Sequence, residues 1–175
     1  MFFSLSAPRP WSLVLAWLTF TALLAGNLSP ALAEEDKQDE TIEILFLGDR
    51  AGHNPSARFR QFEPVMKERG IVLTYTEDLQ DLNPETLKAY DGLLIFANHT
   101  RISPEQEAAL LEYVEAGNGL IPLHSASFCF LNSPKYIALV GAQFQRHGAG
   151  VFRTTSAGVD HPVTQGFGGF ESWDE

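Results

Sequence analysis

Residues 42–49 have the sequence Ile-Glu-Ile-Leu-Phe-Leu-Gly-Asp, and this stretch decides the fold class of the chain. Five of its first six residues are apolar, which is typical of a strand that is buried on both faces. Gly48 and Asp49 close the run, as a strand end requires. Runs of the same kind follow at residues 71–75, 92–97 and 120–123. The sequence therefore predicts four buried strands.

The segments after the first two strands carry helix signals. Ser56 can cap a helix that ends near Gly70, and Pro64 should kink or shorten this helix because proline lacks a backbone N–H. Asn83-Pro84 has the sequence of an N-cap followed by a first-turn proline, and it predicts a short helix to about residue 89.

The second half of the chain continues the alternation. Residues 103–106 (Ser-Pro-Glu-Gln) have the spacing of a capping box, and residues 117–119 (Gly-Asn-Gly) end that helix. A short helix is predicted over residues 134–140 and a fifth strand over residues 151–155.

Strands that alternate with helices form parallel sheets, because right-handed crossovers return each strand in the same direction. We therefore predict an α/β domain over residues 41–175, with a doubly wound parallel sheet of about five strands in a flavodoxin-like arrangement. In such sheets, ligands bind outside the carboxyl ends of the strands.

Polar and ionisable side chains gather where these strands end. They are Asp49, Arg50, Gly52 and His53 after the first strand, Asn98, His99 and Arg101 after the third, and His124, Ser125 and Ser127 after the fourth. We expect them on one rim of the sheet, with His147 and Asp160-His161-Pro162 folding over it from later loops. All five histidines thus lie at strand ends or in loops, which favours a functional site over packed core histidines.

Nucleophilic catalysis is a weaker interpretation of the same rim. Ser125 lies at a strand-to-loop turn, where α/β hydrolases carry a nucleophile, but the G-x-S-x-G motif is absent. His124 and Ser125 are neighbours on an extended chain, so their side chains point to opposite sides. Cys129 stands between Phe128 and Phe130, which predicts a buried and inert thiol.

The sequence contains no motif that identifies a bound nucleotide, cofactor or metal ion. Residues 50–54 lack G-x-G-x-x-G and the P-loop lysine, so a nucleotide site is disfavoured, and no cofactor is identified. Metal-dependent hydrolysis is a third hypothesis, which requires the imidazoles to converge on one ion. No H-x-H or H-E-x-x-H spacing supports it, and we assign no metal ligands.

The N-terminus has the order of a secretory signal. Arg9 precedes an apolar run over residues 11–24, and Ala31-Leu32-Ala33 forms an A-x-A site ahead of Glu34. We expect residues 1–33 to be removed and residues 34–40 to form an acidic linker, which makes this an exported, periplasmic or extracellular protein. The alternative is a membrane anchor, but the run falls short of the roughly 20 apolar residues that a spanning helix needs.

Composition narrows the partners. The formal net charge is −10 at pH 7, so nucleic acid is a poor partner, and without a basic cluster an anionic membrane surface is disfavoured as well. The single cysteine allows no internal disulfide, so stability must come from the core. A neutral or cationic small ligand is easier to accommodate on this surface.

Several motifs, taken in order, resemble one known family. They are residues 46–48 with Gly52-His53, residues 90–98 (YDGLLIFAN), residues 117–126 (GNGLIPLHSA), residues 141–144 with His147-Gly148, residues 160–163 (DHPV) and the closing Asp174-Glu175. Together they span nearly all of the chain after residue 40, and they resemble the ThuA-like (trehalose utilisation) domain.

The resemblance implies a class I glutamine amidotransferase-like fold and a role in carbohydrate metabolism, on oxidised (keto) sugars or disaccharides. Family members often form part of larger exported proteins with dehydrogenase or haem-binding domains, which implies an oxidoreductase partner. The pocket positions carried over from the family are His53, Asn98, His124, His147, His161 and Glu175. The relatives' elbow cysteine is replaced by His124-Ser125, so glutamine hydrolysis is not expected. The family pattern continues beyond residue 175, so we expect a C-terminally incomplete domain.

Two functions follow from these residues. In the first, an enzyme acts on a sugar derivative with His53 and His124 as acid and base. The residues expected to bind substrate are Asp49, Asn98, His99, Ser125, His147, His161 and Glu175. In the second, a non-catalytic module binds sugar for a partner oxidoreductase and stacks the rings on Trp173, Phe167 and Phe170, although core packing is the commoner role for the two phenylalanines.

Overall fold

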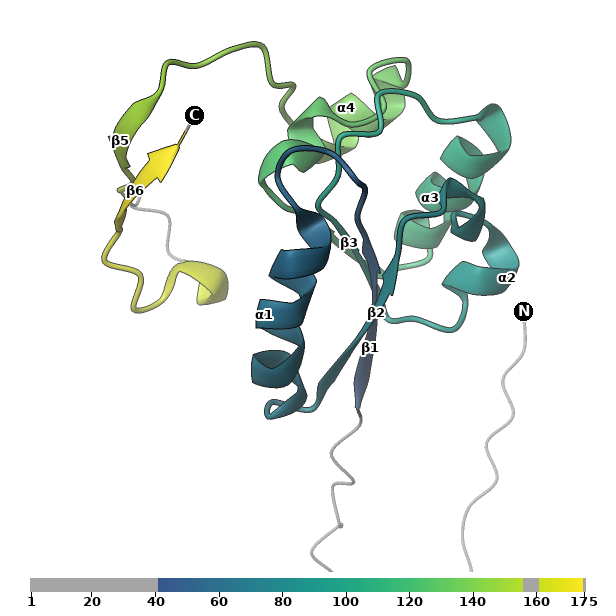
Figure 1. The fold of residues 1–175 in the computed structure, drawn as a ribbon. Helices are drawn as coiled ribbons and strands as arrows, with labels where there is room; N and C mark the ends of the chain where they lie inside the picture. Colours follow the sequence, from purple (N-terminus) through teal and green to yellow (C-terminus); the bar gives the residue numbers. More distant parts are fainter. Residues whose placement is uncertain (1–40, 156–160, 175) are drawn as a thin grey trace, which may run out of the picture. The chain divides into compact units, whose positions relative to one another are not determined.

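The computed structural model describes residues 41–155 and 161–174, and its centre is a parallel four-stranded sheet (Figure 1). The strands are β1 (Ile42–Leu47), β2 (Ile71–Thr76), β3 (Gly92–Ile95) and β4 (Gly119–Pro122), in the order β2-β1-β3-β4. The helices are α1 (Pro55–Lys67), α2 (Pro84–Leu87), α3 (Pro104–Glu115) and α4 (Pro134–Val140), with short 3₁₀ helices η1 (Leu79–Asp81), η2 (His124–Phe128) and η3 (Pro162–Thr164). The predicted α/β class, its first four strands and the helix over residues 134–140 are confirmed.

Strand β1 shows how the sequence covers both faces of the sheet. Leu45 and Leu47 belong to the core cluster that contains residues of α2 and α3, whereas Ile44 and Phe46 pack with residues of α1. Figure 1 shows α1 on one side of the sheet and α2 and α3 on the other. Both faces of β1 are therefore apolar, which explains its nearly continuous apolar run.

Helix α1 begins earlier than the sequence predicts. Its N-cap is Asn54, in the left-handed region at φ 51°, and the Asn54 side chain accepts a hydrogen bond from the Ala57 N–H. Ser56 is therefore inside the helix, and the expectation of a Ser56 cap is wrong. The helix continues past Pro64 to its end because this proline lies in the last turn, where few residues follow it. Gly70 has a positive φ of 74°, as the sequence requires.

The start of α3 is the predicted capping box. Ser103 accepts a hydrogen bond from the Gln106 N–H, and the Gln106 side chain accepts one from the Ser103 N–H. Asn83 caps α2 in the same way by accepting from the Thr86 N–H. Both helix starts are thus fixed by local sequence.

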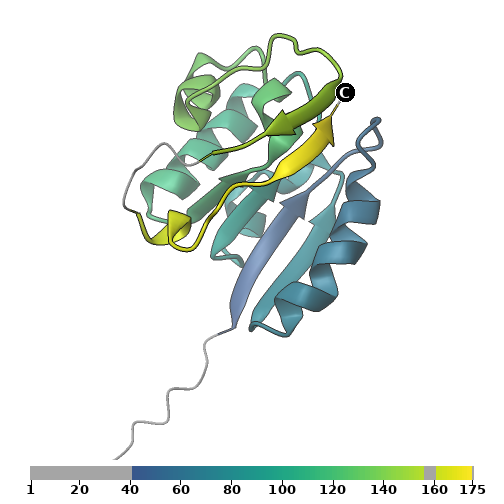
Figure 2. The same ribbon diagram turned by 90° about the vertical axis from the view of Figure 1, so that its left-hand side faces the viewer.

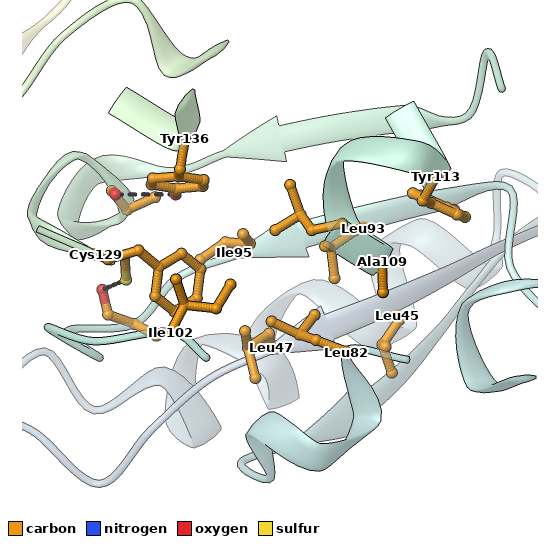
Figure 3. Packing of buried hydrophobic residues seen from close by; sticks show 14 of the residues in the cluster. Leu45, Leu47, Leu82, Leu93, Ile95, Ile102, Ala109, Tyr113, Cys129 and Tyr136 are labelled. Carbon is orange, nitrogen blue, oxygen red and sulfur yellow. Dashed lines mark hydrogen bonds between the residues drawn. The ribbon is translucent and has the colours of Figure 1, made fainter. Parts of the chain in front are cut away.

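The larger core lies on the face of the sheet that α2 and α3 cover (Figure 3). Leu47, Leu93 and Ile95 are fully buried there. The Tyr136 hydroxyl of α4 donates to the Ala126 carbonyl oxygen at 3.0 Å, which ties α4 to the turn after β4. This packing holds the carboxyl ends of β1, β3 and β4 in fixed relative positions.

The predicted fifth strand does not join the parallel sheet. Strand β5 (Gly150–Arg153) pairs antiparallel with β6 (Glu171–Asp174) in a separate two-stranded sheet, visible in Figure 2. Val151 and Phe152 are 68% and 43% exposed, whereas a strand of a doubly wound sheet is buried on both faces. The strand predicted over residues 151–155 is therefore confirmed, but its place in the parallel sheet is wrong, and within the described residues that sheet has four strands.

Four expectations concern parts outside the described residues: the signal segment over residues 1–33, the acidic linker over residues 34–40, Asp160 and Glu175. Among residues 41–155 and 161–174, no helix has the length and apolar character to cross a membrane.

Candidate functional site

The candidate site lies at the carboxyl ends of three neighbouring strands. His53 lies in the loop after β1, Asn98 follows β3, and His124 follows β4. Strand β2 lies on one side of β1, and β3 and β4 lie on the other, so the order of the strands reverses at β1. The carboxyl ends of β1 and β3 therefore form the topological switch point of the sheet. The sheet thus places three separate chain segments around one hollow.

His53 and His124 are in direct contact. Their ring centroids lie 4.7 Å apart with an interplanar angle of 81°, an edge-to-face arrangement. The ring of Phe96 lies 6.0 Å from each of them. The structure therefore brings together two imidazoles that are separated by 71 positions in sequence.

His124 is held by a strained backbone. Its φ of 47° is in the left-handed region, which is uncommon for a residue other than glycine. Its carbonyl oxygen accepts a hydrogen bond from the Ser127 hydroxyl at 3.2 Å, within η2. Such strain persists where the surroundings fix the turn, and it is concentrated at functional sites. At this turn the histidine lines the hollow.

Asp174 of β6 completes the group. Its carboxylate oxygens lie 3.9 Å from His124 Nε2 and 4.0 Å from His147 Nε2, which is ion-pair distance when the imidazoles are protonated. Sequence reasoning assigned a role to Glu175, which is outside the described residues, and overlooked its neighbour Asp174. The ending Asp174-Glu175 was the available signal, but it could not show which of the two carboxylates faces the histidines.

These residues line a pocket of about 380 Å³, which we call the histidine pocket. Its lining consists of His53, Asn98, His124, Ser125, Ser127, Phe128, Phe144, His147 and Asp174. Asn98 Oδ1 and Ser125 Oγ are buried and have no hydrogen-bond partner within the described residues. A buried polar atom without a partner calls for a bound molecule or water, because leaving it unpaired is costly.

Asp49 supports the histidine pocket but does not line it. It is 8% exposed, and its carboxylate accepts hydrogen bonds from the backbone N–H groups of Ala51 and Asn98. The carboxylate thus connects the loop after β1 to the loop after β3. Through this connection Asp49 positions Asn98 beside the histidine pocket.

His99 lies in a different hollow, with Asp49, Arg50, Glu77 and Asp78. Its Nε2 is 3.0 Å from the Gly48 carbonyl oxygen. In this hollow the hydrogen bond from Arg50 holds the pKa of Glu77 below its ordinary value, and burial with the Glu77 hydrogen bond raises the pKa of Tyr75 to about 12. The structure therefore does not bring His99 to His53 and His124.

His161 is also apart from the histidine pocket. It is exposed, and its Nδ1 accepts a hydrogen bond from the Val163 N–H as the cap of η3. Of the sequence-predicted site residues, the structure brings together His53, Asn98, His124, Ser125 and His147.

The described residues contain no activated nucleophile at this turn. Burial raises the pKa of the Cys129 thiol to about 12, and its Sγ donates to the Ala97 carbonyl oxygen at 2.9 Å. The expectation of a buried thiol is confirmed, and its inertness stays a prediction. Within the two described ranges, no group of three His, Cys, Asp or Glu side chains has the arrangement of a metal site.

Comparisons with known proteins identify the family. A family model described as ThuA, trehalose utilisation, matches residues 43–175. The solved structure of a putative ThuA-like protein from Bacteroides uniformis ATCC 8492 has the same fold, with a TM-score of 0.62 at 19% identity. The match covers 77% of this chain and 61% of that one, so the present chain spans about three fifths of the solved protein's length. A comparison with curated proteins finds no match. Because the family model covers most of the sequence, this chain belongs to the ThuA (trehalose utilisation) family.

Proposed function

We propose that the histidine pocket binds a sugar derivative and that His53 and His124 act on it as an acid–base pair. One observation carries the proposal: two imidazoles from separate loops lie 4.7 Å apart, in a pocket that also contains buried polar atoms without partners. Histidine suits both roles because its ordinary pKa lies near neutral pH, so either protonation state is accessible.

The chemistry that fits this pair is proton transfer beside a carbonyl group. On a keto sugar, the neutral imidazole removes a proton from the carbon next to the ketone, and the protonated imidazole donates one to the carbonyl oxygen. The product is an enediol, and the two imidazoles have exchanged protonation states. Such an intermediate serves isomerisation or cleavage of a neighbouring linkage, so the reaction class is a sugar-active isomerase, lyase or hydrolase.

The other pocket residues have supporting roles in this proposal. The Asp174 carboxylate lies opposite Nε2 of both His124 and His147, and in this proposal it orients the two rings. The Asn98 amide and the Ser125 hydroxyl are suited to hydroxyl groups of a sugar, because each has a buried polar atom to satisfy. A pocket of about 380 Å³ is in the range of small-ligand sites.

The substrate class is taken from the family. Its description is trehalose utilisation, which supports a role in carbohydrate metabolism. We extend this to a keto sugar or a disaccharide, acted on after export of the protein. The export proposal rests on residues 1–33, and N-terminal sequencing of the secreted chain should then begin at Glu34.

The test is turnover of keto-disaccharides by His53→Gln and His124→Asn variants. Asparagine at position 124 tolerates the positive φ of the turn, so the fold is retained. Each variant should lose roughly 10²–10⁴-fold in kcat, the usual contribution of acid–base catalysis. Lys88→Ala, which changes the exposed C-cap residue of α2, is the control and should keep wild-type activity. Full turnover in both histidine variants would exclude the acid–base assignment.

A second function has one observation in its favour. Phe167, Phe170 and Trp173 are 43%, 54% and 61% exposed, so the commoner expectation of core packing for the two phenylalanines is wrong. Exposed aromatic rings suit a sugar-binding module that hands its ligand to an oxidoreductase. Calorimetry in the same experiment separates the two functions, since sugar binding by the wild type without any product would favour the module.

A further inference from the structure

His147 has a defined tautomer in the histidine pocket. Its Nδ1 lies 3.0 Å from the Gly148 carbonyl oxygen, and a carbonyl oxygen can only accept a hydrogen bond. Nδ1 therefore carries the hydrogen, and in the neutral ring Nε2 is an acceptor. This Nε2 lies 4.0 Å from a carboxylate oxygen of Asp174, which is an acceptor as well. Two acceptor atoms thus face each other.

The space between these two acceptors fits one donor atom. Atoms 4.0 Å apart are too distant to share a hydrogen bond directly. Both can, however, lie about 2.8 Å from a nitrogen placed between them, which is the length of a charge-assisted hydrogen bond. A ligand nitrogen that carries several hydrogens would therefore satisfy His147 and Asp174 at once.

The rest of the lining also favours a cationic donor. Asp174 is the only Asp, Glu, Lys or Arg side chain among the described residues that line the pocket. Asn98 Oδ1 is a buried acceptor, and Ser125 is 7% exposed; neither oxygen has a hydrogen-bond partner within the described residues. The net charge of −10 adds to the negative potential around the carboxylate. These groups suit a ligand that brings positive charge and N–H donors.

We propose that the histidine pocket binds an amino sugar, with its ammonium group between Asp174 and His147. This inference rests on the proposed function, since it requires the pocket to bind a sugar derivative. An ammonium group has three N–H donors and a positive charge, whereas a sugar hydroxyl has one donor and no charge. The ammonium group therefore matches the carboxylate and the imidazole nitrogen better than a hydroxyl does.

The amino group also suits the proton transfer proposed for His53 and His124. In the open-chain form of a 2-amino sugar, the carbon that bears the nitrogen is next to the carbonyl group. One imidazole removes the proton from this carbon while the other donates a proton to the carbonyl oxygen. A C–H bond breaks, an O–H bond forms, and the double bond moves from C=O to C=C. The positive charge on the nitrogen makes this C–H bond more acidic.

The test measures the affinities of the wild type for glucosamine, glucose and N-acetylglucosamine by calorimetry at pH 7. At this pH the amine of glucosamine is mostly charged, and an imidazole of ordinary pKa is mostly neutral. Glucosamine should bind at least about tenfold more tightly than glucose, a difference of roughly 1.4 kcal/mol. N-acetylglucosamine should bind no better than glucose, because acetylation removes the charge and leaves one N–H donor.

Variants of strand β6 locate the charge that is responsible. Asp174→Asn should remove most of the preference for glucosamine, because the amide keeps the size of the side chain without its charge. The matched control is Glu171→Gln, which removes a carboxylate that lies 3.8 Å from Arg153 and does not line the pocket. It changes the net charge by the same amount and should keep the preference. The affinity for glucose should stay unchanged in both variants, which verifies that the pocket is intact.

The outcomes distinguish this inference from the function on which it rests. A preference for glucosamine that persists in Asp174→Asn would overturn the ammonium site and leave the sugar pocket in place. Equal wild-type affinities for glucosamine and glucose, or tight binding of N-acetylglucosamine, would do the same. A wild type that binds none of the three sugars but turns over keto-disaccharides would overturn this inference alone. Absence of both binding and turnover would overturn both proposals.

Discussion

The parallel sheet and the β5–β6 hairpin both contribute to the site, but they are stabilised in different ways. In the sheet, Leu47, Leu93 and Ile95 are fully buried between helices. In the hairpin, Val151 and Trp173 remain more than half exposed. The hairpin is instead held by its backbone pairing and by hydrogen bonds between Thr154 and Phe170.

This difference teaches how the site is built. His53 and His124 stand on strand ends whose positions are fixed by a packed interior. Asp174 and Phe152 are carried by an element that buries little apolar surface, and such elements open at lower free energy. We therefore expect substitutions in the sheet to lower the stability of the domain. Substitutions in the hairpin should weaken the site and leave the stability of the sheet unchanged.

Leu93→Ala should have the largest effect on stability. Leu93 is fully buried in β3, between β1 and β4, so truncation loses transfer free energy and leaves a cavity. The expected loss is about 2–5 kcal/mol in the free energy of unfolding, measured by denaturant titration. Val163→Ala, at a position that is 83% exposed, is the control and should change it by less than about 0.5 kcal/mol. Similar losses in both variants would contradict the contrast between core and surface.

Gly169→Ala should damage the hairpin and spare the sheet. Gly169 has a positive φ of 81°, and a Cβ placed there would lie 2.3 Å from the Thr154 carbonyl oxygen. The local cost should be about 1–3 kcal/mol, seen as faster proteolysis of the hairpin and weaker glucosamine binding at an unchanged midpoint for the sheet. The neighbouring Gly168 has open space around its Cβ position, so Gly168→Ala is the matched control. A fall of the sheet midpoint in Gly169→Ala alone would show that the two regions unfold together.

The smallest effect is expected at Cys129, whose thiol should not react with a labelling reagent while the core is intact. Burial raises its pKa to about 12, so at pH 8 its thiolate fraction should be about three orders of magnitude below that of an ordinary cysteine. Ellman's reagent should label it only after unfolding in guanidinium. Because the folded pKa is raised, the associated stability is fully present below the unfolded value near 9 and is lost as the pH rises toward 12. Rapid labelling of the native chain would show that the core around α4 opens readily.

Local signals were enough to predict most of the fold. The capping box at Ser103 and the N-cap at Asn83 depend on neighbouring residues, so the sequence shows them directly. The Ser56 cap was wrong because Asn54 can adopt a positive φ and caps the helix first. The fifth strand is present as β5, but its expected place in the parallel sheet was wrong, because its pairing with β6 leaves no local mark in the sequence.

The candidate site was predictable in part. Parallel topology brings His53, Asn98 and His124 to one edge, and this follows from strand order alone. Asp174 was missed because its place opposite His124 and His147 depends on the register of the hairpin. The same is true of Phe152, whose ring centroid lies 6.0 Å from that of His147.

The sequence by itself determined the α/β class, the strand ends that carry the histidines, and a buried cysteine, because apolar runs and caps act over a few residues. Only the tertiary structure decided that His99 and His161 lie apart and that Asp174 faces two imidazoles. The reason is physical: which loops meet is set by packing and strand pairing between residues far apart in the chain, and the free energy of those contacts is not encoded in any single segment.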